Sequence, residues 1–448
     1  MIGAALYHPA AYDTARPIGS LWAETAGPGP DFPVLEGGAE ADVAILGGGF
    51  TGLSAALHLA RDHGLGAAVV EAGPVGWGAS GRNGGFCGLG GAKLSQAEIA
   101  ARHGLDEAKR FFALKRASVE RVRGLLADEA IRADAGPDGE VELAHAPGAF
   151  AGFAAAAAES LAVYGYRQEV LPPDALRERG LQAAGVHGGL LQSEGFGLHP
   201  LKYVRGLAQA AWRRGARIFE HSPVRAWRRE GGGHVLETER GRLRAGRVIV
   251  ATAGYTPEGL DPRLRGRVLP ALSNILTTRP LTAAERAAQG WTAETLAFDS
   301  RILLHYFRLL PDGRFLFGGR GGLSAAPGAE AAYRRRLERA FRRAFPAWAG
   351  VETTHFWRGF VDLAADRLPH CAAFADDPTA FHGLAYHGSG VALGTEVGAQ
   401  LAALAAGRPT GALPAFMARP APRFPLPGLR LAYLAGAYAG FGLRDRMG

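Results

Sequence analysis

The sequence predicts a mixed fold: an α/β domain of the Rossmann type together with an α+β domain built on an antiparallel sheet. A strand, a glycine-rich turn, a helix and a second strand follow one another between residues 42 and 71, which is typical of a parallel α/β unit. Residues 266–354 alternate short apolar runs with charged turns, which is typical of antiparallel strands. The 448 residues, 48% of them hydrophobic, are enough for two cores.

The strand–turn–helix–strand unit carries a dinucleotide-binding pattern. The apolar run DVAIL predicts a buried strand, and Gly47, Gly49 and Gly52 follow it in the order G-x-G-x-x-G. The helix after them has one apolar face and is expected to end near Gly64, and the second strand closes with Glu71. Such glycines let backbone N–H groups approach a pyrophosphate, while the acidic residue accepts hydrogen bonds from ribose hydroxyls.

A second glycine cluster, GWGASGRNGGF at residues 76–86, begins five residues after Glu71. Taken alone, it could be a flexible surface loop. In a parallel sheet, however, ligands bind beyond the carboxyl ends of the strands, where this segment is expected to lie. We therefore expect its backbone to pack against the dinucleotide, with Arg82 supplying charge beside the phosphates or the ring.

The blocks ADVAILGGGFTGLSAALHLA and GWGASGRNGGF resemble the D-amino-acid oxidase-like superfamily of FAD-dependent oxidoreductases, and are most similar to its gamma-glutamylputrescine oxidase type. Further similar blocks cover most of the chain, at residues 20–26, 197–224, 247–255, 305–320, 357–370 and 386–402 and in the C-terminal tail. The resemblance implies FAD, which we expect to be bound without a covalent link. The motifs and the resemblance together place these residues at FAD: Gly47, Gly49, Phe50, Thr51, Gly52, Glu71, Ala72, Gly78, Ala79, Ser80, Arg82, Asn83, Gly84, Gly85, Val224, Ala253, Gly254, Trp357, Gly388, Ser389, Gly390, Val391 and Ala392.

The resemblance also implies two interleaved, discontinuous domains. A leader at 1–37 precedes an FAD-binding domain made of 38–98, 190–265 and 355–412, a substrate domain made of 99–189 and 266–354, and a tail at 413–448 packed on the body. Residues 99–128 carry a helical apolar stripe that includes Phe112, Val119 and Val122, and we expect this helix to cover the substrate domain.

The implied reaction is FAD-dependent oxidation of an amine or an amino-acid-like molecule. Hydride leaves the carbon next to nitrogen, the imine hydrolyses, and oxygen is the expected acceptor, giving hydrogen peroxide. The sequence has no G-x-S-x-G motif and no histidine–carboxylate pair of diagnostic spacing, which fits chemistry supplied by a cofactor. Two alternatives stay open: a dehydrogenase that passes electrons to a quinone or an electron-transfer protein, and a non-catalytic FAD-binding protein. A nicotinamide enzyme is disfavoured because the later blocks suit a buried flavin.

The segment HYFRLLPDGR suggests substrate-binding residues. Tyr306 and Arg308 are two residues apart on one strand and so share a face. We expect Arg308 to pair with a substrate carboxylate and Tyr306 to add a hydroxyl or a ring wall; the alternative is a structural arginine paired with an acidic residue. Glycine and D-amino-acid oxidases place their carboxylate-binding arginine nearer the turn, where this chain has Leu310. Many relatives have a histidine where this chain has Ser389, which leaves His387 as a candidate catalytic residue.

Composition limits the other classes of function. The net charge of +8 is spread along the chain, so we expect no nucleic-acid partner, although acidic small molecules are favoured. Two cysteines, Cys87 and Cys371, cannot form a disulfide framework or a zinc site, and each is expected to be a small buried residue. No apolar run has the length of a membrane span, and the first residues lack a secretory pattern. We expect a cytoplasmic monomer with no metal and no membrane requirement.

Overall fold

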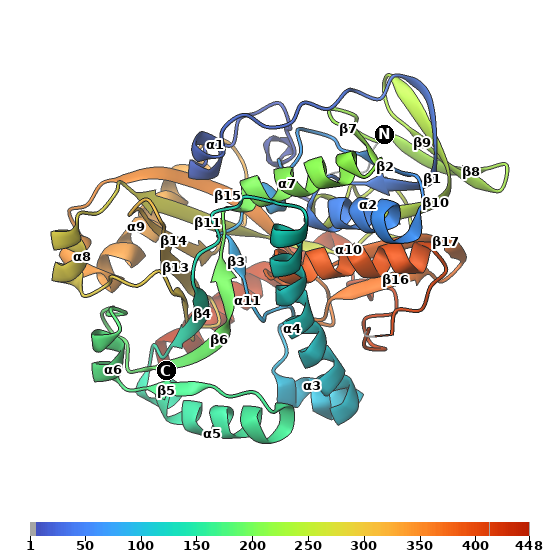
Figure 1. Cartoon of the computed structure of the whole chain (residues 1–448). Helices are drawn as coiled ribbons and strands as arrows, with labels where there is room; N and C mark the ends of the chain where they lie inside the picture. The colour runs from blue at the N-terminus through green and yellow to red at the C-terminus, as the bar shows by residue number, and fades with distance from the viewer. Residues whose placement is uncertain (1–5, 412, 448) are drawn as a thin grey trace.

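The structure, a computed structural model, describes residues 6–411 and 413–447. Residues 1–5 of the predicted leader, residue 412 of the predicted FAD-binding domain and residue 448 of the tail lie outside the described part. Two β-sheets lie side by side, and most of the helices surround them (Figure 1). The predicted combination of an α/β layer with an interleaved, mainly antiparallel sheet is confirmed.

The first sheet is the Rossmann-type layer. Its central strands run in the order β16-β17-β10-β1-β2-β7, and the four pairings from β17 to β7 are parallel. A β8–β9 hairpin pairs with the first half of β10, on the edge whose second half pairs with β17. The strands are β1 (Gly37–Leu46), β2 (Ala67–Val70), β7 (Arg217–Phe219), β8 (Ala226–Glu230), β9 (Gly233–Glu237), β10 (Gly241–Val250), β16 (His370–Phe374) and β17 (Asp377–Leu384).

Helices α2 (Phe50–His63), α7 (Pro200–Arg213) and α10 (Ala392–Ala405) cover one face of this sheet. Helix α2 starts directly after the glycine turn and ends, as predicted, at Gly64, which takes the left-handed conformation with φ of 62°. The turn needs glycine for space: a Cβ on Gly52 would lie 2.0 Å from the Gly47 carbonyl oxygen. The local prediction for β1, α2 and β2 is therefore confirmed.

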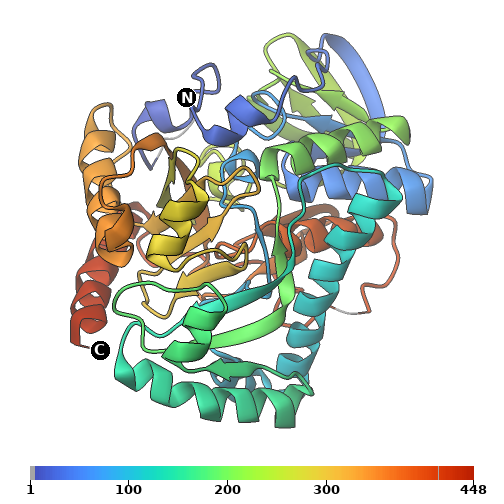
Figure 2. The same cartoon turned by 60° about the vertical axis from the view of Figure 1, so that its left-hand side comes forward.

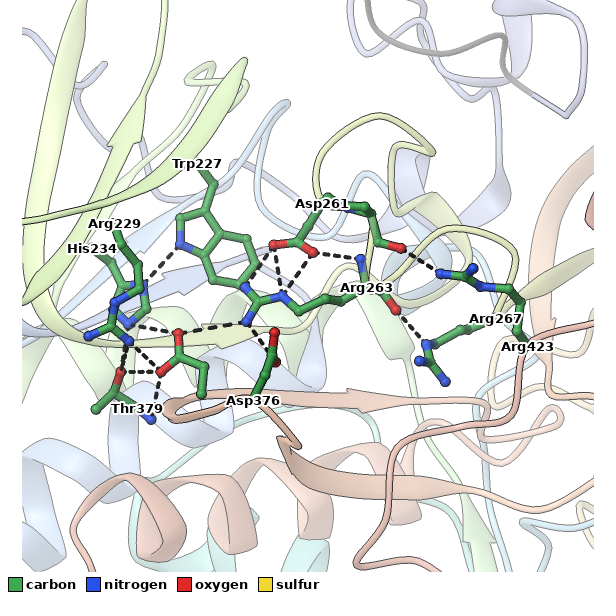
Figure 3. Close-up of polar contacts among 11 residues, drawn as sticks. Trp227, Arg229, His234, Asp261, Arg263, Arg267, Asp376, Thr379 and Arg423 are labelled. Atoms are coloured by element: carbon green, nitrogen blue, oxygen red, sulfur yellow. Dashed lines mark hydrogen bonds and ion pairs between the residues drawn. The ribbon is translucent and has the colours of Figure 1, made fainter.

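A network of polar contacts lies on the other face of the sheet (Figure 3). Arg229 of β8 donates to the Asp377 carboxylate of β17 at 2.6 Å, and Arg263 pairs with Asp261 at 2.7 Å while lying over the Trp227 ring at 4.9 Å. Burial alone would raise the pKa of Asp377, but hydrogen bonds from Thr379 and Arg229 outweigh it and lower this pKa to about 2. The network ties the hairpin to the sheet.

The second sheet has the order β15-β11-β14-β13-β12-β4-β6-β3, with β5 paired to β6. All its pairings are antiparallel except that of β12 with β4. The strands are β3 (Phe86–Cys87), β4 (Asp138–Leu143), β5 (Glu169–Leu171), β6 (Gly189–Gly197), β11 (Leu269–Thr278), β12 (Leu296–Asp299), β13 (His305–Leu309), β14 (Phe315–Arg320) and β15 (Thr353–Leu363). The predicted PDG turn joins β13 to β14, with Gly313 at φ of 81°.

Two predictions about organisation need correction. Residues 190–197 and 355–363 were expected in the FAD-binding domain, but they form most of β6 and β15 and pair with β4 and β11 of the second sheet. Helix α4 (Leu105–Asp128) was expected to cover the substrate domain. Its Val119 and Val122 instead join the core of α2 and α10. In both cases partners distant in the sequence decide the position.

The remaining helices surround the second sheet or end the chain. They are α1 (Leu21–Thr25), α3 (Gln96–His103), α5 (Pro147–Tyr164), α6 (Pro173–Glu178), α8 (Ala283–Gln289), α9 (Ala329–Ala344) and α11 (Arg430–Met447). Figure 2 shows α11 in red close to α9 in orange. Leu434 of α11 packs on Leu269 of β11, and the Asp445 carboxylate accepts the backbone N–H groups of Ile302 and Leu303 at 2.9 and 3.0 Å. Within the described ranges, no helix is both long and apolar enough to span a bilayer.

Candidate active site

One cavity of about 700 Å³ lies between the two sheets. The start of α2, the glycine cluster at 76–86 and the turn before α10 line one side, and the inner face of the second sheet lines the other. The predicted FAD residues that line it are Gly49, Phe50, Thr51, Ala79, Ser80, Arg82, Asn83, Gly84, Ala253, Gly254, Gly388, Ser389, Gly390 and Val391. A cavity of this size suits a small-molecule site.

The glycine cluster at 76–86, called the glycine loop below, is held by hydrogen bonds from its own polar side chains. The Asn83 amide nitrogen donates to the carbonyls of Ala79 and Ser80 at 3.1 and 2.9 Å, and the amide oxygen accepts the Gly85 N–H at 2.8 Å. The Ser80 hydroxyl accepts the Phe50 N–H at 3.0 Å, which joins the loop to the first turn of α2. The loop is thus an ordered wall of the cavity.

Two indole groups hold the loop from behind. Trp22 Nε1 donates to the Asn83 carbonyl at 2.8 Å, and Trp357 Nε1 donates to the Arg82 carbonyl at 2.7 Å. The two rings meet edge to face, with centroids 6.1 Å apart. Trp357 was predicted at FAD, but it does not line the cavity. Its observed contact is with the loop, and sequence reasoning missed the similar role of Trp22.

The Arg82 guanidinium uses only some of its hydrogen-bond donors. Its Nε donates to the Trp77 carbonyl at 2.6 Å, its Nη1 donates to the Arg358 carbonyl at 3.2 Å, and the group lies 4.0 Å from the centre of the Trp77 ring. Nη2 is buried without a hydrogen-bond partner in the described part of the chain. A buried orphan donor is costly unless a ligand accepts from it, so this atom fits a cofactor that carries phosphate or carbonyl oxygens.

Glu71 ends β2 beside the glycine turn. Its carboxylate accepts the Gly48 N–H at 2.6 Å and the Gly73 N–H at 3.0 Å. Burial raises the pKa of this carboxyl group, and the two backbone donors oppose that shift. The lining of the cavity does not include Glu71 or the other predicted FAD residues Gly47, Gly52, Ala72, Gly78, Gly85, Val224 and Ala392, so their contact with FAD stays a prediction.

The inner face of the second sheet supplies the opposite wall. Tyr306 lies directly across from Phe298, and Phe298 from Glu142, so one row of side chains crosses β13, β12 and β4. The Tyr306 hydroxyl lies 2.9 Å from Ser273 Oγ, and burial raises its pKa to about 12. Glu140 lies two residues from Glu142 on the same face of β4 and accepts a hydrogen bond from Gln192 at 2.6 Å.

Arg308 does not reach this cavity, which corrects the expectation that it binds substrate. Its side chain is 4% exposed, Nη2 donates to the Leu198 carbonyl at 2.6 Å, and the guanidinium lies over the Trp22 ring at 5.7 Å. The absence of a side chain at Gly197 leaves room for this group, since a Cβ there would lie 2.0 Å from Nη1. Arg308 is structural, although its partner is a backbone carbonyl and not an acidic residue.

Three other cations line the cavity, and sequence reasoning missed all of them. Lys93 lies in the segment after β3, Lys115 lies in α4, and Arg320 ends β14. His387, the predicted candidate, also lines the cavity; it is 2% exposed and has φ of 54°. Burial first, then the charges of Lys93 and Arg320, lower the pKa of His387 to about 3, so its ring is neutral. Gly318 and Gly319, just before Arg320, indicate an unusual strand end in the sequence. No sequence pattern distinguishes Lys93.

The fold and the site define a nucleotide-dependent oxidoreductase of the flavoprotein class. A family model described as DAO, FAD dependent oxidoreductase, matches residues 42–404, and the chain belongs to this family. The chain is 32% identical over 430 residues to a probable oxidoreductase OrdL of Rhizobium meliloti, covering 96% of this chain and 98% of the relative. It is 30% identical over 446 residues to the gamma-glutamylputrescine oxidoreductase of Escherichia coli, again covering 96% and 98%.

Solved structures share the fold at lower identity. Glycine oxidase from Geobacillus kaustophilus superposes with a TM-score of 0.68 at 21% identity, over 83% of this chain and 96% of that one. An L-amino acid deaminase from Proteus vulgaris superposes with a TM-score of 0.67 at 20% identity, over 85% and 93%. The prediction of an FAD-dependent oxidoreductase of this family is confirmed.

The predicted role of Glu71 can be tested by FAD affinity. Glu71→Ala should weaken FAD binding to the apoprotein roughly 10- to 100-fold, because a hydrogen bond to a charged group contributes about 1.5–3 kcal/mol. The measurement is fluorescence titration with FAD. Asp42→Ala is a matched control, since Asp42 also accepts a backbone N–H, from Gly66 at 2.7 Å, whereas Glu71 accepts one from Gly48 of the glycine turn. Equal affinities for FAD in the two variants would contradict a hydrogen bond between Glu71 and the ribose.

Proposed function

We propose that the protein oxidises an amine or an amino-acid-like small molecule, with FAD bound without a covalent link and oxygen as the electron acceptor. One observation carries the proposal: a single cavity joins the glycine loop to a face of the second sheet that carries carboxylates and a cation, Arg320. The names of the relatives support it, since one is a gamma-glutamylputrescine oxidoreductase and a structural neighbour is a glycine oxidase.

The chain offers groups that would hold FAD. Arg82 Nη2 would donate to it, and the backbone from Gly388 to Val391 lies at the amino end of α10, where unpaired N–H groups favour negative charge. When bound, FAD would supply the capacity to accept hydride from the carbon next to nitrogen. The protein would position the amine and exclude water from the 700 Å³ cavity.

The carboxylates on β4 support an amine substrate. Glu140 and Glu142 line the cavity, and burial is the largest cause that raises the pKa of each to about 7. Glu140 has a neutral partner in Gln192, which satisfies a hydrogen bond without neutralising charge. A protonated amine would favour the ionised form of either carboxylate and would repay part of its desolvation cost.

The cysteines support the two other parts of the proposal, which are the attachment of FAD and the cellular compartment. Cys87 and Cys371 are fully buried and do not line the cavity, which supports a flavin with no link to cysteine. Two cysteines in 448 residues support a reducing compartment such as the cytoplasm, where we place a monomer. The competing functions are a dehydrogenase that uses a quinone or an electron-transfer protein, and an FAD-binding protein without turnover.

An amine panel tests the function. Under anaerobic conditions, at least one amine or amino-acid-like compound should bleach the absorbance of the bound flavin, and in air the same compound should release hydrogen peroxide. The matched control is the compound with its nitrogen replaced by oxygen, which should leave the flavin oxidised. Bleaching without peroxide would favour the dehydrogenase, and no bleaching by any amine would favour the protein without turnover.

Acid precipitation tests the attachment of FAD. The yellow chromophore should pass into the supernatant when the holoprotein is denatured with acid, because no covalent bond retains it. The measurement is the ratio of flavin absorbance in the supernatant to that in the washed pellet. Colour that stays in the pellet would contradict non-covalent binding.

A further inference from the structure

A second and smaller cavity, of about 250 Å³, lies between α9, α11 and the place where β13 begins and β14 ends. Helix α9 lines it with Arg336, Ala340 and Arg343, whose spacing of four and three residues puts them on one face of the helix. Helix α11, which lies close to α9 in Figure 2, contributes Asp445. None of the predicted FAD residues belongs to the described lining, so the flavin site does not account for this cavity.

The two arginines of α9 that line the second cavity have no ionic partner. Neither the Arg336 nor the Arg343 side chain forms a hydrogen bond or an ion pair among the residues that the structure describes. By contrast, Arg334 and Arg342 of the same helix both pair with Glu338, at 2.9 and 4.0 Å. The positive charge of α9 is therefore compensated away from the cavity and left uncompensated beside it.

The carboxylates near the second cavity already have other partners. Asp445 is the one carboxylate of the described lining, and its two oxygens accept the backbone N–H groups of Ile302 and Leu303 at 2.9 and 3.0 Å. Asp299 lies outside the lining and pairs with Arg301 at 2.6 Å. Neither carboxylate forms an ion pair with an arginine of α9 in the described part of the chain. An anion from outside the chain would fill this role.

A buried arginine behind the wall adds positive charge. Arg358 of β15 is 8% exposed, its Nε donates to Asn274 Oδ1 at 2.9 Å, and its guanidinium lies 4.5 Å from the centre of the Tyr333 ring. Asn274 and Tyr333 both line the second cavity. Arg358 Nη2 is buried and meets no hydrogen-bond partner within residues 6–411 and 413–447. A buried guanidinium without a carboxylate partner makes the potential in the neighbouring cavity more positive.

The chemistry of the lining matches a phosphate group. A guanidinium offers a planar fork of N–H donors that pairs with two phosphate oxygens. Arg336 and Arg343 are two helical turns apart, about 10 Å along the axis, so their long side chains can bind one group from two directions. A phosphate near neutral pH carries close to two negative charges, which would compensate both arginines, whereas a single carboxylate would compensate only one.

We propose that the second cavity binds phosphate, either as inorganic phosphate or as the phosphate group of a small molecule. Arg336 and Arg343 bind its oxygens, and Arg358 stabilises its charge from behind the wall. The site goes beyond the proposed function, because it needs neither flavin nor amine. Arg320 lines both cavities, which brings the bound phosphate next to the wall of the candidate active site.

Equilibrium dialysis of the holoenzyme tests the site. Radiolabelled inorganic phosphate and glycerol 3-phosphate are tested separately at about 0.15 M salt, where weak attraction to the surface is screened, and glycerol is the neutral control. We expect at least one of the anions to bind and glycerol not to bind. Arg336→Met and Arg343→Met should each raise the Kd of the anion that binds more tightly by about 10-fold or more, because each removes a charged pair of donors.

Arg339→Met is the matched control. It removes the same charge from the same helix, at an exposed residue outside the cavity lining, and should leave the Kd within about 2-fold. Tighter binding of glycerol 3-phosphate would identify a phosphorylated molecule as the ligand, and tighter binding of inorganic phosphate would identify the free anion. Absence of binding by both anions, an unchanged Kd in Arg336→Met and Arg343→Met, or an equal loss in Arg339→Met would overturn the site. The amine panel tests turnover separately, so either result can fail while the other stands.

Discussion

The rest of the site depends on two hydrogen bonds behind the glycine loop. Residues 76–86 form the wall where the two sheets meet, and the side chains of Asn83 and Ser80 hold only part of this segment. Trp22 comes from the leader and Trp357 from β15, and their indole N–H groups hold the neighbouring carbonyls of Asn83 and Arg82. Residues outside the loop, from the N-terminal segment and the second sheet, thereby help to hold its shape. Within this held loop, Arg82 Nη2 is buried without a hydrogen-bond partner among the described residues.

The charges around the cavity follow from this arrangement. Behind the loop, Arg308 fills the space that Gly197 leaves and donates to the Leu198 carbonyl, so it supports the wall and does not face the substrate. In front of the loop, Arg320 at the end of β14 lines the cavity beside Gly388, and the carboxylates of β4 lie three strands away from β14.

Local features of the fold could be predicted from the sequence, and features that depend on distant partners could not. The glycine turn, α2 and its end at Gly64 follow from neighbouring residues, and the structure confirms them. The side of the molecule that α4 covers and the sheet that β6 joins depend on residues far along the chain. In the site, the shared face of Tyr306 and Arg308 was correct, but periodicity does not reveal that the cavity ends between them. Lys93 and Arg320 meet only through folding, so their spacing in the sequence carries no signal.

The most direct test of this account is the FAD affinity of a protein that lacks both indole donors. Trp22→Phe combined with Trp357→Phe keeps aromatic rings in the core but removes the two hydrogen bonds to the loop. Each such bond contributes about 0.5–1.5 kcal/mol, so the account predicts a Kd for FAD raised at least about 5-fold in the double variant. Trp212→Phe, a change at a residue that is 60% exposed, should leave the Kd unchanged. A double variant that folds and binds FAD as tightly as the Trp212→Phe protein would contradict the account.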